Sequence, residues 1–225
     1  MRERATAMGM ALGLAVAGLA CSGAETNVVN QYFTALRAND QNTLTSFAMV
    51  AFDQKVDDWK VVSVSPGTRT PATLPDLVKK QKELEAELAK NTRDARAWGN
   101  DLAVYPKLDQ MREIRGKGGK VPANLQPIAD KWDAFQNKDR ELKKAVADAK
   151  AAVEREKRNV GLSVGQVDDI ESLTGETITK DVDVNLTIGG QVKPYTITLR
   201  KYELTGGTGG RMVSRWVVQS LTPKA

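Results

Sequence analysis

The 225-residue chain contains no histidine and only one cysteine, and each shortage excludes whole classes of site. Without histidine there is no Ser-His-Asp triad, no His-ligated metal and no imidazole to move protons near pH 7. One cysteine cannot form a disulfide within the chain, nor a zinc or iron–sulfur site built from several cysteines. We therefore expect no catalytic residues, no metal and no cofactor, and we interpret the protein as non-enzymatic.

Aromatic residues are also scarce, at 5% of the chain, yet the composition is that of a folded protein. Hydrophobic residues make up 41% and charged residues 27%, a balance that excludes an intrinsically disordered chain. The length is sufficient for one or two domains. The formal net charge of +5 comes entirely from residues 74–161, which hold 20 basic and 15 acidic side chains. Charge therefore separates that segment from the rest.

Long hydrophobic runs are missing except at the amino terminus. There, residues 5–20 carry no charge and follow Arg2 and Arg4, but a helix that crosses a bilayer needs about 20 residues. Residues 1–20 therefore predict a signal peptide rather than a permanent membrane span. The run ends in small residues, Gly18-Leu19-Ala20, which are followed by the only cysteine, Cys21.

The segment that ends at Cys21 resembles the lipobox of bacterial lipoprotein precursors. The resemblance implies cleavage before Cys21, diacylglycerol on its sulfur, and a fatty acid such as palmitate on the new amino terminus. Because Ser22 and not aspartate follows, it implies a cell-envelope protein in the outer membrane, facing the periplasm, if the host has two membranes. An ordinary secretory signal that includes a cysteine is the alternative. Residues 21–26 would be the lipidated cysteine and a tether shorter than about 20 Å.

Residues 27–73 and 162–225 predict a small α+β body. An apolar stripe at helical spacing begins at Asn27, and a second short helix follows around Leu44. Residues 164–178 predict a loop or a strand. The β-rich runs predict a small, curved antiparallel sheet with the amino-terminal helices packed on it. These runs are residues 59–64, 181–188, 195–199 and 212–221.

This order of elements resembles the nuclear transport factor two-like (cystatin-like) α+β superfamily, which includes uncharacterised bacterial lipoproteins. The resemblance is carried by VVNQYFTALRAND, WKVVSV, PYTITLRKYEL and SRWVVQSL. It implies a bent sheet that wraps around a helix. Another small α+β sandwich is the alternative. Enzymes of that superfamily use Asp, Tyr and His, but no such group can be matched here.

Residues 74–161 change in character to a sequence rich in Ala, Lys, Glu and Leu. Core positions recur at alternating spacings of three and four over residues 77–105 and again over residues 128–160. This repeat predicts a long antiparallel two-helix coiled-coil hairpin inserted into the body. Pro106 predicts a kink or a new helix start in the first arm.

We predict the register in which the numbers of facing residues sum to 237. Trp98 then faces Asp139, and Gln81 shares a layer with Glu156. The turn falls at Gly118-Gly119, where glycine allows a tight reversal of the chain. Other facing pairs in this register are Leu77–Val160, Leu84–Val153, Asn91–Val146, Leu102–Phe135 and Tyr105–Trp132.

Four basic residues surround the predicted turn, opposed only by Glu113. They are candidate contacts for anionic headgroups, cell-wall phosphate or an acidic partner. The alternative is a solvated loop. Nucleic acid is not an expected partner, because the protein is exported and no aromatic residue lies among these charges. The four candidates are Arg112, Arg115, Lys117 and Lys120.

The remaining motifs do not predict chemistry. Residues 115–121, RGKGGKV, lack the first glycine, the Ser/Thr and the preceding strand of a phosphate-binding loop. The glycines at 206–210 predict a loose hairpin. Two acidic clusters lack the spacing of a calcium loop and predict solvated turns. These clusters are Asp53, Asp57 and Asp58, and Asp168, Asp169 and Glu171.

Taken together, the sequence predicts an envelope lipoprotein held in the lipid bilayer through acylated Cys21. Its hairpin would act as an interaction or scaffold element for an envelope protein or a cell-wall partner. The alternative function is a binding module for a small apolar ligand, in a cavity lined by Tyr32, Phe33 or Tyr195. A catalytic function would require a buried acid with a shifted pKa inside such a cavity.

Overall fold

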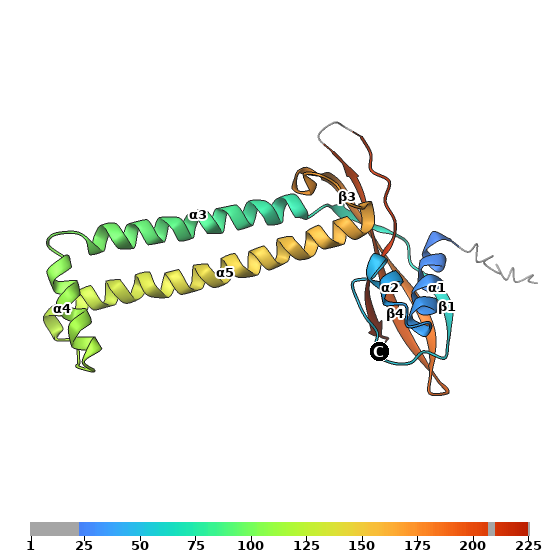
Figure 1. Cartoon of the computed structure of the whole chain (residues 1–225), viewed down its shortest axis with the longest axis horizontal. Helices are drawn as coiled ribbons and strands as arrows, with labels where there is room; N and C mark the ends of the chain where they lie inside the picture. Colours follow the sequence, from blue (N-terminus) through green and yellow to red (C-terminus); the bar gives the residue numbers. More distant parts are fainter. Residues whose placement is uncertain (1–22, 207–209, 225) are drawn as a thin grey trace, which may run out of the picture.

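A computed structural model describes residues 23–206 and 210–224 as an α+β protein with a five-stranded antiparallel sheet (Figure 1). A long two-helix extension leaves the sheet. The α-helices are α1 (Ala24–Arg37), α2 (Gln41–Phe47), α3 (Leu74–Gly99), α4 (Tyr105–Gly116) and α5 (Gln126–Val164). Two short 3₁₀ helices are η1 (Ala123–Leu125) and η2 (Ile170–Ser172). The strands are β1 (Asp58–Val64), β2 (Thr68–Pro71), β3 (Thr174–Ile188), β4 (Gln191–Thr205) and β5 (Val217–Pro223).

The sheet is built on a long ribbon of β3 and β4. These two strands pair over their full 15 residues without a bulge and are joined by Gly189 and Gly190, which both have positive φ. Strand order is β1-β3-β4-β5, and β2 also pairs with β3. The alternation at residues 181–188 and the glycine turn are confirmed. Strand β3 begins earlier, at Thr174, the last strand begins at Val217 rather than at 212, and β2 was not predicted.

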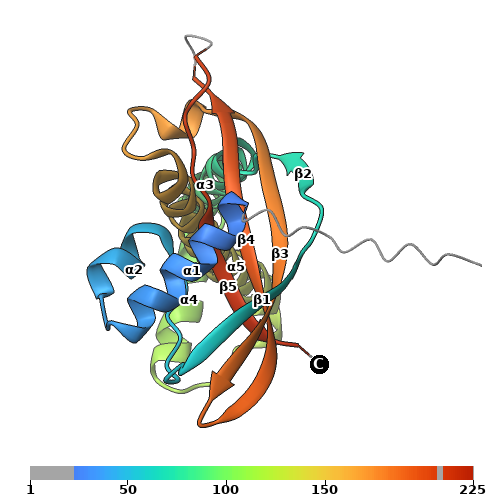
Figure 2. The same ribbon diagram turned by 90° about the vertical axis from the view of Figure 1, so that its right-hand side faces the viewer.

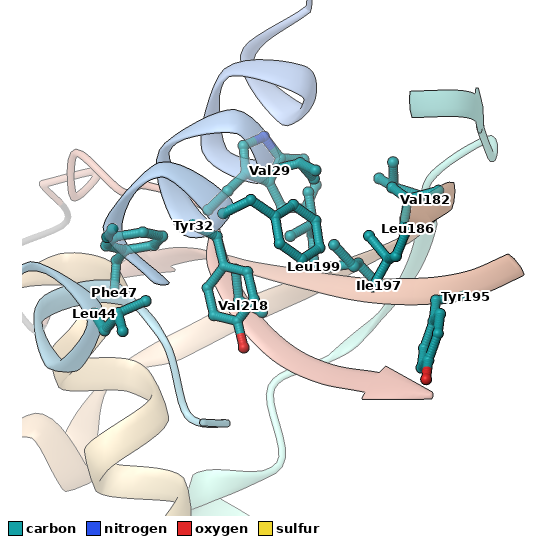
Figure 3. Packing of buried hydrophobic residues seen from close by; sticks show 14 of the residues in the cluster. Val29, Tyr32, Leu44, Phe47, Val182, Leu186, Tyr195, Ile197, Leu199 and Val218 are labelled. Atoms are coloured by element: carbon teal, nitrogen blue, oxygen red, sulfur yellow. The ribbon is translucent and has the colours of Figure 1, made fainter. Parts of the chain in front are cut away.

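The half of the ribbon near this turn packs against α1 and α2. On that half, every second side chain of each strand points into the core, as expected for a sheet with one wet face. Tyr32 and Phe33 of α1 are fully buried there, with their rings edge to face at 5.3 Å. Figure 3 shows this core. Its sheet residues include Val182, Val184, Leu186, Tyr195, Ile197, Leu199 and Val218.

The other half of the ribbon uses its opposite face. Tyr202 and Leu204 are buried with Leu74, Val78 and Val153 in a second core at the base of the extension. Ile197 and Leu199 belong to the first core, and Tyr202 is three positions after Leu199, an odd offset. Since neighbouring residues of a regular strand point to opposite faces, the two cores lie on opposite sides of the ribbon. In Figure 2, α1 crosses in front of the sheet and the extension lies behind it.

We call residues 74–164 the arm. Helix α3 leaves the sheet, and α5 returns alongside it for 39 residues (Figure 1). Pro106 lies in the first turn of α4, so the predicted new helix start is confirmed. At the other end of the chain, α1 begins at Ala24 and not at Asn27, so three of the six residues expected to form the tether are helical. Cys21 lies outside the described residues.

The predicted register between the arm helices is wrong. The Trp98 ring lies 5.6 Å from that of Phe135 rather than beside Asp139, and the Asn91 amide donates to the Phe135 carbonyl oxygen at 3.3 Å, not toward Val146. Glu156 accepts a hydrogen bond from Thr73, at the start of α3, at 3.1 Å, and does not share a layer with Gln81. All these contacts lie closer to the start of α5 than predicted, in keeping with a shift of one heptad.

The shift has its cause at the far end of the arm. Helix α3 ends at Gly99, and α4 with η1 is inserted before α5, so pairing stops near Trp98 instead of continuing to Tyr105. Leu102, predicted to face Phe135, is 92% exposed. A third core covers the start of α5 instead. Its fully buried members are Leu108, Met111, Leu125 and Ala129.

Candidate functional site

The four predicted anion contacts lie on the second half of α4 and the turn after it, but most of them are already engaged. Arg115 donates two hydrogen bonds to the Asp133 carboxylate of α5, at 2.6 and 2.8 Å. This paired geometry is the strongest form of an arginine–carboxylate contact. Hydrogen bonding from Arg115 lowers the pKa of Asp133. Arg115 therefore links α4 to α5 and is already paired with a carboxylate.

The other three basic residues differ in availability. The Arg112 guanidinium lies 4.2 Å from the centre of the Trp132 ring, a cation–π contact. Lys117 forms an ion pair with Glu113 one turn earlier in α4, at 2.5 Å. Lys120 forms no ion pair within the part of the chain that the structure describes. The structure thus brings the four residues to one end of the arm without forming an anion site.

The glycines of RGKGGKV end a helix rather than cradle a phosphate. Gly118 has φ +73°, its N–H donates to the Arg115 carbonyl, and the Gly119 N–H donates to the Ile114 carbonyl at 2.8 Å. This pair of bonds is the Schellman motif that closes α4. The expectation that the segment is not a phosphate-binding loop agrees with this geometry.

An apolar surface at the end of the arm was not predicted. Leu102 is 92% exposed and Tyr105 is 55% exposed. The heptad pattern assigned both residues to the seam, because their spacing from Trp98 is that of core positions. The sequence did contain evidence against a continuous helix here. Gly99-Asn100 favours the end of one helix, and Pro106 favours the start of another.

A buried polar cluster joins the arm to the sheet, and we call it the arm junction. At its centre is Glu156 of α5, which is 6% exposed. Its carboxylate accepts hydrogen bonds from the hydroxyl groups of Tyr202 at 2.8 Å and Thr73 at 3.1 Å. The Asn159 amide donates to it at 3.0 Å and the Arg200 guanidinium at 3.4 Å. Burial raises the pKa of Tyr202, which keeps its hydroxyl a donor at neutral pH.

A second set of contacts holds the carboxyl end of α5. Arg215, in the segment before β5, donates through Nε to the Leu162 carbonyl and through Nη2 to the Ser46 carbonyl of α2, both at 2.8 Å. The Ser163 hydroxyl donates to the Arg215 carbonyl at 2.8 Å. A cation at the end of α5 satisfies free carbonyls and complements the helix dipole. The base of the arm is thus attached to both α2 and the segment before β5.

The residues expected to line an apolar ligand cavity are core residues. Tyr32 and Phe33 are fully buried and Tyr195 is 5% exposed, all in the first core. Burial raises the pKa of Tyr32 to about 12, and its hydroxyl donates to the Val50 carbonyl. A recess of about 680 Å³ is open and lies elsewhere, at the end of α5. It is lined by Arg158, Gly161, Leu162, Gly165, Gln166, Val167, Asp168 and Ile170.

The two acidic clusters take part in local structure. The Asp57 carboxylate accepts the Gly189 N–H, and Glu171 pairs with Lys157 of α5 at 2.5 Å. Asp169 has φ +55° at the turn into η2. Over residues 23–206 and 210–224, no group of three or more acidic or cysteine side chains could hold a metal ion.

Among the described helices, none is both long and apolar enough to cross a membrane. Comparisons with models of known families, with curated proteins and with solved structures give no match to this chain.

Proposed function

We propose that this protein is an envelope lipoprotein, anchored through acylated Cys21, whose arm acts as a non-enzymatic interaction or scaffold element. The body would stay at the bilayer, and the arm would hold its far end away from it. We also infer that α3 and α5 pair as an antiparallel coiled coil, with Asn91 as a buried polar residue in the seam. A nuclear transport factor two-like body remains part of this proposal.

The observation that carries the proposal is the placement of the chain start relative to the arm. Helix α1 and the end of the arm at α4 lie at opposite ends of the long axis (Figure 1). Cys21 precedes the first described residue, Gly23, by two positions, so a lipid on it lies within about 10 Å of α1. With α1 at the bilayer, the arm points away from it. A 39-residue helix adds about 58 Å of reach.

The way the arm is attached also supports a spacer. The arm junction and the Arg215 contacts hold the base of α5 from three sides, through β4, α2 and the segment before β5. Breaking a buried, hydrogen-bonded charge is costly, so such a base resists bending. A spacer needs this property, whereas a flexible tether does not.

The arm can be shortened without harming the body, which gives a direct test. Residues 83–147 would be replaced by a four-residue glycine-containing turn, so that Leu74, Val78, Val153 and Glu156 keep their contacts with the sheet. We expect the shortened protein to remain folded and membrane-bound and to lose crosslinking to its envelope partner in intact cells. The measurement is chemical crosslinking followed by mass spectrometry, with circular dichroism to check folding.

A second protein provides the matched control. Four exposed arm residues changed to alanine, Lys82, Lys90, Lys144 and Lys150, leave the length of the arm intact and should leave crosslinking unchanged. Unchanged crosslinking in the shortened protein would contradict a role for the arm in partner capture.

A further inference from the structure

The end of the arm carries an apolar surface that no described part of the chain covers. We call it the tip patch and define it as Leu102, Ala103, Tyr105 and Pro106. Leu102 is 92% and Tyr105 55% exposed, and Ala103 and Pro106 are exposed as well. Elsewhere in the arm, within the described residues, every large hydrophobic side chain is at least half-buried. In the arm, exposure of large apolar side chains is therefore confined to the end farthest from the body.

The tip patch is held in place by its own loop. The Asp101 carboxylate accepts the Ala103 N–H at 2.8 Å, and the Asp101 carbonyl accepts the N–H groups of Val104 at 2.9 Å and Tyr105 at 2.7 Å. Val104 packs into the third core beneath. Leu102 thus points to solvent although Leu108 and Met111 form an apolar core nearby. A binding surface with this preorganised shape loses little conformational entropy when a partner binds.

The charges around the tip patch identify the kind of surface it fits. Asp101 precedes the patch directly, and Asp109 lies one helical turn beyond Tyr105 on the same face of α4. Exposed Lys107 follows Pro106 directly, whereas Arg115 and Lys117 lie at the opposite end of α4 and are paired with carboxylates. The patch thus has two neighbouring carboxylates, Asp101 and Asp109, against one neighbouring cation, Lys107. This negative balance opposes an anionic lipid surface and favours a partner with cations next to an apolar recess.

We propose that the tip patch binds an apolar recess on a protein partner, rimmed by lysine or arginine side chains. Leu102 fills the recess, Tyr105 packs beside Leu102 at the centre of the interface, and Asp101 and Asp109 meet the partner's cations. A large aromatic and an aliphatic residue at the centre, with charges at the rim, are the usual anatomy of such an interface. This inference rests on the proposed function of the arm and names the part of it that makes contact.

A photo-crosslinking amino acid in place of Leu102, in the full chain and in intact cells, tests the proposal. We expect one discrete protein adduct from position 102, and none from the exposed mid-arm position Ala147 used as a control. Adding Tyr105→Asp to the position-102 protein should reduce the adduct at least about tenfold, since removing one central contact of an interface has effects of this size. Glu141→Gln, an exposed change on α5, should leave it unchanged.

Other outcomes overturn the inference. A lipid-mass adduct at position 102 would assign the tip patch to a bilayer, and an adduct to a second copy of this chain would assign it to self-association. A protein adduct that Tyr105→Asp does not reduce would mean that the patch makes no specific contact. An adduct at Ala147 and not at 102 would also overturn it, while leaving the proposed function of the arm in place, because capture would then occur along its side.

Discussion

Replacing Glu156 with alanine is expected to destabilise the protein by about 3–5 kcal/mol, the usual cost of removing one member of a buried charged pair. The carboxylate is 6% exposed and is the common acceptor for the hydroxyl groups of Tyr202 and Thr73, the Asn159 amide and the Arg200 guanidinium. Without it, the fully buried Tyr202 hydroxyl and the Asn159 amide lose their partner. Urea unfolding followed by circular dichroism measures the loss.

The control for this prediction is two residues away on the same helix. Glu154 is 68% exposed and forms one ion pair with Lys157 at 3.2 Å, so Glu154→Ala should change the free energy of unfolding by less than about 0.5 kcal/mol. Glu156→Gln keeps the acceptor oxygen and should cost less than the alanine variant. Equal stability of the two alanine variants would show that the arm junction does not hold the arm to the sheet.

Replacing Gly175 with alanine is the second change with a large expected effect, about 3 kcal/mol. Gly175 lies in β3 with φ +145°, opposite Leu204 of β4. A Cβ at this position would lie 2.2 Å from the Glu203 carbonyl oxygen, which belongs to the backbone and cannot move without opening the ribbon. Because Leu204 belongs to the second core, the same change loosens the base of the arm.

A matched glycine in α4 separates this local cause from a general effect of alanine. Gly116 has no atom within 4 Å of a built Cβ and no positive φ, so Gly116→Ala should be neutral or stabilising by up to about 1 kcal/mol. Hydrogen exchange of the amides at 174–178 should increase in Gly175→Ala and not in Gly116→Ala. A Gly175→Ala protein as stable as the parent would mean that the ribbon tolerates separation at this point.

The spacing of apolar residues correctly predicted those elements that bury one apolar face. The alternation at 181–188 and the stripe from Val29 to Leu36 each have one apolar face, and only one regular structure buries such a face. Gly189-Gly190 indicated the turn after residue 188, because glycine readily adopts the positive φ that such a turn requires. Strand β2 was missed because all four of its residues are exposed, so nothing in its pattern distinguishes it from a loop.

The register of the arm could not be predicted from its pattern. A shift of one heptad places core positions opposite core positions again, so hydrophobicity does not distinguish the two alignments. The length of the segment between α3 and α5 decides between the two alignments. Helix α4 lies in that segment and contains residues that the heptad pattern assigned to the seam. The second buried face of the ribbon was missed for a similar reason. Tyr202 and Leu204 follow the apolar residues that end at Leu199, but Tyr202 is three positions after Leu199 and therefore points to the opposite face of the strand.

The prediction of an anion site failed because it counted basic side chains without knowing which carboxylates they pair with in the fold. Arg115 seemed free in the sequence because Asp133 is 18 residues away, yet the two form the best-aligned ion pair at the arm end. For Glu156, the prediction named the wrong partner. Glu156 was assigned to a polar layer between the arm helices, and it is the residue that ties the arm to β4.

The distance between the arm end and the bilayer tests whether the arm holds its far end away from the membrane. The proposed acylation of Cys21 would block its thiol, so a single added cysteine could carry a fluorescent donor, either at Lys120 on the arm end or at Asn27 on α1. The protein would be placed in vesicles whose headgroups carry an acceptor. We expect strong quenching at Asn27 and little at Lys120, since the arm adds about 58 Å. Equal quenching at the two positions, or acceptor-independent fluorescence at Asn27, would contradict it.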